Sequence, residues 1–159
     1  MKKISVDTIK KLRDESGAPV IRVKKVLEEF ADLPAQAGEK KALALLKKEG
    51  FEKAIRREGR ATGAGVISTY SHHSGKIVSA VELLCETDFV ARNDLFSQLG
   101  KNLAMQVASM KPADTKRLLE QDFIKDSAKK VQDLVKEVIA KTGENVRVGR
   151  IFRMELGEK

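Results

Sequence analysis

Three short motifs carry residue types that could do chemistry, and each also has a simpler structural interpretation. His72-His73 could bind a metal ion, but adjacent residues point to different sides of a strand or turn, and no third histidine lies nearby. Cys85 could be a nucleophile, but no motif places a histidine beside it, which favours a buried core thiol. Gly63-Ala64-Gly65 is too short for a phosphate-binding loop. The sequence therefore predicts no catalytic residue, no metal site and no cofactor.

The segment Thr87-Asp88-Phe89-Val90 suggests recognition of a partner rather than catalysis. It lies between a strand that we predict to end at Cys85 and a helix that we predict to begin near Asp94. An acidic residue beside a large aromatic residue at such a corner can project outward as a pair. Alternatively, Phe89 packs inward and Asp88 caps a helix, and the spacing alone favours this second interpretation.

Composition narrows the class of protein. The chain has 159 residues, 42% hydrophobic and 34% charged, enough for one ordinary domain or two small ones. The net charge is +8, but the basic runs are interleaved with Glu and Asp, and only 4% of residues are aromatic, so nucleic acid is not the expected primary partner. The single cysteine excludes an internal disulfide. Because the sequence has neither a long apolar run nor a signal-peptide pattern, we expect a cytoplasmic protein without membrane contact.

The charge distribution predicts a boundary near residues 55–60. Residues 1–60 hold 16 basic and 10 acidic side chains, whereas residues 61–100 hold 2 and 4. We predict a three-helix module at 1–50, a basic helical linker at 51–63 and an α+β core at 64–159. Three helices over about 50 residues leave no room for a pocket, which is typical of a docking module.

Turn and cap residues delimit the three predicted helices. Ser5 caps the first, and Pro19 suits the first turn of the second. Residues 33–38 form a connector to the third helix, which we predict to end at Gly50.

The core is predicted to combine antiparallel strands with helices on one side. The β-rich segments 65–70 and 76–85 flank a turn at 71–75, which predicts a hairpin. The helix from Asp94 has an apolar stripe of Leu95, Leu99, Leu103 and Val107. A last strand at 146–156 has one face formed by Val146, Val148, Arg150, Phe152, Met154 and Leu156. This pattern defines an α+β fold.

Several segments together resemble the elongation factor Ts family, the bacterial exchange factors for elongation factor Tu. Thr87-Asp88-Phe89-Val90 is similar to the family signature. Other similar segments keep the family's order over nearly the whole chain: Leu12-Arg13, Ser16-Gly17-Ala18, Lys24-Lys25-Val26-Leu27, Gly65-Val66-Ile67, the helix from Leu103 to Ala108, Lys111-Pro112 and Gly143-Glu144-Asn145-Val146. The resemblance implies a ubiquitin-associated-like N-terminal module, a linker, and a core of antiparallel strands packed with helices.

The resemblance also implies a function without covalent chemistry, namely guanine-nucleotide exchange during translation elongation. Phe89 would wedge near the Mg²⁺ site of elongation factor Tu, and Asp88 would disturb the charges around the ion, so that GDP is released and the nucleotide-free state is stabilised. Thr87 and Val90 complete this corner. The N-terminal module would grip a helix of the partner's nucleotide domain through Leu12, Arg13, Val20 and Ile21.

The chain departs from the family pattern in three respects. It holds one core subdomain and no inserted coiled-coil hairpin, similar to short members that pair two chains, so a homodimer is implied, formed through the last strand or the helix after residue 94. Pro19-Val20-Ile21 stands where many members have a glycine and two methionines, which keeps an apolar surface but makes it stiffer. The segment 31–41 is longer than usual.

Two other functions remain open. A nascent-chain adaptor could use the three-helix module alone, but it would leave Asp88-Phe89 without a role. A ribosome-associated RNA-binding protein would use the positive charge, and its binding would fall steeply with salt and depend little on Phe89.

Overall fold

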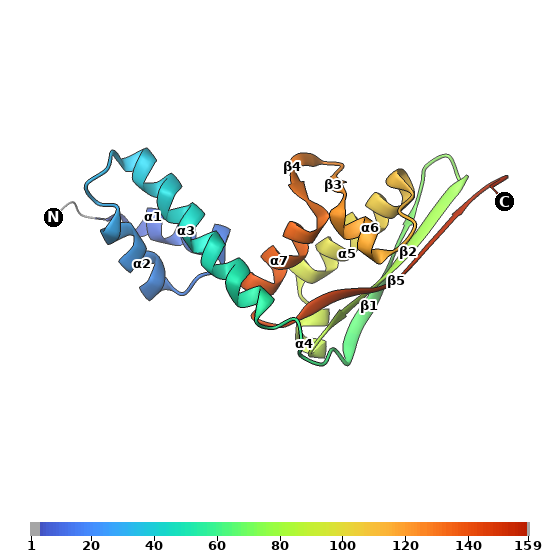
Figure 1. The fold of residues 1–159 in the computed structure, drawn as a ribbon, viewed down its shortest axis with the longest axis horizontal. Coiled ribbons are helices and arrows are strands. Elements are labelled where there is room, and N and C mark those ends of the chain that lie inside the picture. Colours follow the sequence, from blue (N-terminus) through green and yellow to red (C-terminus); the bar gives the residue numbers. More distant parts are fainter. Residues whose placement is uncertain (1–3, 159) are drawn as a thin grey trace.

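The computed structural model describes residues 4–158 as a helical N-terminal part joined to a sheet covered by helices (Figure 1). The helices are α1 (Val6–Ser16), α2 (Val20–Glu29), α3 (Ala35–Ile55), α4 (Asp88–Ala91), α5 (Asp94–Met110), α6 (Thr115–Glu120) and α7 (Val131–Thr142). The strands are β1 (Ala64–Ser71), β2 (Ile77–Cys85), β3 (Asp122–Phe123), β4 (Asp126–Lys130) and β5 (Val146–Glu155). No helix within this described part is long and apolar enough to cross a lipid bilayer.

Local capping explains where the first two helices begin and end. The Ser5 hydroxyl accepts a hydrogen bond from the Thr8 amide at 3.0 Å, and α1 ends at Gly17, whose φ of 70° is the left-handed conformation that glycine tolerates. Helix α2 follows directly after Pro19. The three N-terminal helices share a separate apolar core formed by Leu12, Val23, Val26, Leu27, Ala42 and Leu46.

Helix α3 is longer than predicted at both ends. It begins at Ala35 inside the predicted connector, and it continues through Gly50 to Ile55. The prediction that Gly50 ends the helix is therefore wrong. A Cβ atom at Gly50 would lie 3.0 Å from the Cβ of Ala140 on α7, so the glycine allows the two helices to pack closely. Helix α3 thus reaches from the N-terminal core to the main core (Figure 1).

The main sheet has the antiparallel order β1-β2-β5, and the predicted hairpin between β1 and β2 is confirmed. Helices α5, α6 and α7 pack against the sheet and contribute to a single apolar cluster that includes Val81, Leu83 and Phe96. The α+β fold class is confirmed. On α5, Phe96 occupies the buried position that we predicted for Leu95, which is exposed.

Strand β5 changes its buried face halfway along its length, so the predicted single face is wrong. Leu83 pairs with Val148 but Val81 pairs with Ile151, which places one extra residue in β5 at Gly149–Arg150. The Glu82 carboxylate fills this bulge and accepts hydrogen bonds from the backbone amide and the guanidinium of Arg150 at 3.1–3.2 Å. Beyond the bulge, the side chains of Phe152 and Met154 point to the uncovered face of the sheet.

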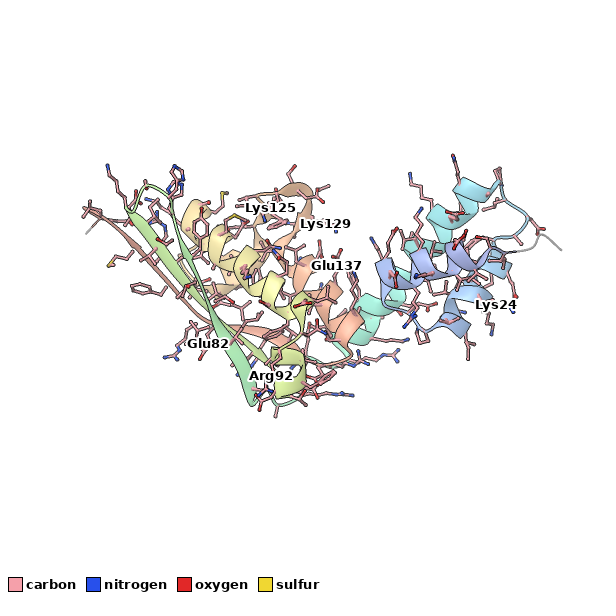
Figure 2. The ribbon with its side chains drawn as sticks, turned by 180° about the vertical axis from the view of Figure 1, so that it is seen from behind. Lys24, Glu82, Arg92, Lys125, Lys129 and Glu137 are labelled. Carbon is pink, nitrogen blue, oxygen red and sulfur yellow. The ribbon has the colours of Figure 1, made fainter. Side chains whose placement is uncertain are left out.

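A small hairpin, β3–β4, follows α6 and was not predicted. The buried Gln106 of α5 holds it: its side-chain amide donates to the Asp122 carbonyl at 3.0 Å, and its side-chain oxygen accepts from the Ile124 amide at 3.0 Å. The Lys129 ammonium of β4 donates to the Glu137 carboxylate of α7 at 2.9 Å, which ties the hairpin to that helix (Figure 2).

Candidate functional site: an exposed aromatic corner and two apolar surfaces

Helix α4 forms the corner between the sheet and α5, and it presents Phe89 to solvent. The Thr87 hydroxyl caps this four-residue helix by accepting a hydrogen bond from the Val90 amide at 3.5 Å. The Phe89 side chain is 83% exposed, and Asp88 beside it is also exposed. The outward interpretation of the sequence is therefore confirmed, and the alternative is wrong, because Phe89 does not pack inward and Thr87, not Asp88, caps the helix.

Val90 does not lie on this outward surface. Its side chain and that of Ala91 are buried in the main core, where they anchor the inner side of α4. Of the four predicted corner residues, Thr87, Asp88 and Phe89 are therefore available to a partner, and Val90 fixes the helix from beneath. Arg92 follows α4 and is exposed near the corner (Figure 2).

Two neighbouring groups complete the environment of the corner. The Glu144 carboxylate accepts hydrogen bonds from the Thr87 amide at 3.0 Å and the Thr87 hydroxyl at 2.6 Å. Cys85 is fully buried, as predicted, and its thiol donates to the Thr87 carbonyl at 3.2 Å. Burial, with a smaller contribution from the Glu144 carboxylate, raises the pKa of the Cys85 thiol, which keeps it protonated and unreactive.

The N-terminal helices present a second apolar surface at the start of α2. Ile21 is 84% exposed, Val20 is also exposed, and Arg13 of α1 is exposed. Leu12, which we predicted to contact a partner, is buried in the three-helix core. Leu12 lies on the apolar stripe of α1, and this stripe faces α2 and α3, which explains why the Leu12 side chain is buried. Of the four residues predicted to contact a partner here, Arg13, Val20 and Ile21 are therefore exposed.

The uncovered face of the main sheet is a third exposed apolar surface, and it includes part of the last strand that the sequence analysis named as a candidate for pairing. Phe152 is 55% exposed and Met154 is 58% exposed on β5, and Ile67 of β1 and Leu156 are also exposed. The alternating apolar residues of β5 indicate that one face of this strand is apolar. The sequence alone does not show that the face changes at the bulge, which leaves Phe152 and Met154 exposed.

The hairpin between β1 and β2 carries the two histidines at an exposed tip. The His72 Nδ1 atom lies 2.9 Å from the Ser74 hydroxyl, and the His72 and His73 rings are close to each other. Within residues 4–158 no three His, Cys, Asp or Glu side chains form a group that could hold a metal ion. The side chains gathered at the exposed surfaces are suited to protein contacts.

Comparison with known proteins points to one family. The family model described as "Elongation factor TS" matches residues 86–159. Elongation factor Ts of Thermotoga neapolitana is 39% identical over 98% of both chains, that of Thermotoga maritima is 39% identical over 98% of this chain and 97% of its own, and that of Solidesulfovibrio magneticus is 37% identical over 99% of both. These relatives are translation elongation factors.

The chain belongs to the elongation factor Ts family, which confirms the resemblance stated from the sequence. Its role accordingly lies in translation elongation, within protein biosynthesis. The alignment with the Thermotoga neapolitana protein runs over 199 positions, which is 40 more than the residues of this chain, so that relative has segments without a counterpart here.

Proposed function

We propose that this chain is a guanine-nucleotide exchange factor for elongation factor Tu. The observation that carries the proposal is the exposure of Phe89 on a helix whose inner side is anchored by Val90 and Ala91. A large aromatic side chain held out in water gains free energy only when a partner covers it. Burying it removes roughly 150–250 Å² from water, which stabilises a complex by at most about 4–6 kcal/mol.

This free energy supports exchange only if it is gained in the nucleotide-free complex. Elongation factor Tu holds GDP through phosphate contacts and Mg²⁺, and Phe89 together with the Asp88 carboxylate would displace groups around that ion. By thermodynamic reciprocity, this chain then weakens GDP binding by the same factor by which GDP weakens binding of this chain. No covalent step is involved.

The surface formed by Arg13, Val20 and Ile21 would provide a second contact with the same partner. Figure 2 places Lys24 of α2 and Arg92 beside α4 in different parts of the molecule, so the two surfaces can engage separate regions of one partner. Linked contacts of this kind raise the overall affinity because the second contact forms within an existing complex.

We further propose that two copies pair through the uncovered face of the main sheet. The face is apolar around Phe152 and Met154, and covering it with an identical face would complete a two-layer arrangement of sheets. The last strand was one of the two candidate surfaces for pairing, and its exposed apolar side chains favour it over the helix after residue 94, whose apolar stripe is buried in the main core except at Leu95.

The exchange proposal is tested by the release of fluorescent GDP from elongation factor Tu. We expect the natural chain to accelerate release, Phe89→Ala to lose most of the acceleration, and Met110→Ala to retain it. Met110 is a matched control because it is an exposed apolar residue at the far end of α5. If the natural chain produces no acceleration, the proposal fails. If Phe89→Ala retains full acceleration, the proposed role of Phe89 is wrong.

A further inference from the structure

A single turn between α7 and β5 holds both the aromatic corner and the segment that leaves α3. The turn comprises Gly143, Glu144 and Asn145, and we call it the clasp. Glu144 accepts the two hydrogen bonds from Thr87, at 3.0 Å and 2.6 Å, although the two residues are 57 positions apart. The end of α3, helix α4 and the start of β5 lie together at this point (Figure 1).

Glu144 controls the cap of α4 through the Thr87 hydroxyl. That hydroxyl donates its proton to Glu144 and therefore offers a lone pair to the Val90 amide. A carboxylate acceptor makes the hydroxyl bond stronger than a neutral one and fixes its rotamer. Because α4 has only four residues, it is far too short to be stable alone. Val90 and Ala91 anchor the inner side of α4, and the cap fixes the first turn of the helix, which carries Phe89.

Asn145 holds the other side of the clasp. Its side chain is buried, and its amide group donates to the carbonyl of Glu58 at 3.2 Å and to that of Arg60 at 2.8 Å. Its backbone amide donates to the Glu86 carboxylate at 2.6 Å, and the Arg60 guanidinium lies 3.7 Å from the same carboxylate. The residues that follow α3 are thereby fixed to the strand end that precedes the corner.

We infer that Glu144 and Asn145 are positioning residues for nucleotide exchange, which set the direction of Phe89 and its placement relative to the N-terminal surface. The inference rests on the proposed function. A partner that binds both surfaces at once requires them at a fixed separation, and a rigid arrangement avoids the entropy loss of ordering the corner during binding. Neither residue needs to touch the partner to have this effect.

The test compares two substitutions at Glu144 in the exchange assay. Glu144→Ala removes both acceptors and is expected to lower kcat/KM for GDP release about tenfold, since it removes two charge-assisted hydrogen bonds. Glu144→Gln keeps one side-chain oxygen that can accept from the Thr87 hydroxyl, and it is expected to stay within about threefold of the natural chain. Glu137→Ala is the matched control, because Glu137 of α7 pairs with Lys129 of β4, away from the corner (Figure 2).

A double variant separates positioning from a general loss of structure. If Glu144 acts through Phe89, Glu144→Ala combined with Phe89→Ala is no slower than Phe89→Ala alone. The inference is overturned if the losses of activity from Glu144→Ala and Phe89→Ala add fully in the double variant. It is also overturned if Glu144→Ala keeps the activity of the natural chain, or if Glu144→Gln is as impaired as Glu144→Ala.

Hydrogen exchange of the free chain tests, without any partner, whether Glu144 orders the corner. We expect Glu144→Ala to speed amide exchange at residues 87–92 while β2 and α5 keep their protection. Unchanged protection at 87–92, or lost protection throughout the core, overturns the inference. If the natural chain fails to release GDP, the proposed function fails, and this measurement still decides whether Glu144 orders the corner.

Discussion

Replacing Phe152 with lysine is expected to convert the proposed homodimer into monomers. Phe152 follows the bulge of β5 and is 55% exposed on the uncovered face of the sheet. Because its side chain contributes little to the core of one chain, we expect the variant to keep the fold and thermal stability of the natural chain.

The size of the effect follows from the exposed area and from symmetry. About half of the roughly 200 Å² of a phenylalanine is available to a second copy, so burying it stabilises the dimer by ~2.5 kcal/mol at ~25 cal/mol per Å². A two-fold interface contains the contact twice, which gives ~5 kcal/mol and weakens dimerisation by roughly 10³–10⁴-fold when it is lost. The two introduced charges would add to this loss.

Sedimentation equilibrium measures the outcome directly. We expect the natural chain to have twice the chain mass of 17.6 kDa, and Phe152→Lys to have the single-chain mass at the same concentration. Val6→Lys serves as a control, because Val6 is an exposed apolar residue of α1 outside the sheet. A natural chain of 17.6 kDa at micromolar concentration would refute the dimer, and a Phe152→Lys variant that remains dimeric would refute pairing through this face.

Three further predictions concern the docking surface, the sheet and the acid stability. Ile21→Ser should weaken binding to elongation factor Tu about tenfold by titration calorimetry without lowering the melting temperature, because Ile21 is exposed; equal affinity would exclude it from the contact. Gly65→Ala should destabilise the fold by about 1–3 kcal/mol in urea unfolding, since a Cβ would lie 2.3 Å from the Leu83 carbonyl oxygen, whereas Gly63→Ala should not. The Arg22 guanidinium lowers the pKa of the Glu49 carboxyl in the folded state. The pair therefore stabilises the fold at pH values above the ordinary pKa of a glutamate, and this stabilisation is lost as the pH falls through the lowered pKa. Glu49→Gln should accordingly lose less stability between pH 6 and pH 3 than the natural chain, and an identical pH dependence would contradict this.

Features that depend on nearby residues could be predicted from the sequence. The cap at Ser5 and the hairpin between β1 and β2 both arise within a few residues of chain. The outward corner at Phe89 was predicted through the resemblance of Thr87-Asp88-Phe89-Val90 to a family signature, whereas the spacing alone favoured an inward Phe89.

Features that depend on distant contacts could not be predicted. Gly50 is a plausible helix end by itself, and only the close approach of α7 explains why α3 continues through it. The face change in β5 depends on Glu82, which is 68 positions from Arg150. The sequence analysis named Glu144 only within a segment that is similar to the family, since nothing in the local sequence indicates that it reaches Thr87.

The affinity of this chain for elongation factor Tu in its nucleotide-free and GDP-bound states tests the exchange proposal most directly. We predict much tighter binding to the nucleotide-free state, by the same factor by which this chain lowers the affinity of elongation factor Tu for GDP. Equal affinities for the two states would contradict the proposal, because a protein that binds both states equally cannot shift nucleotide binding however tightly it binds.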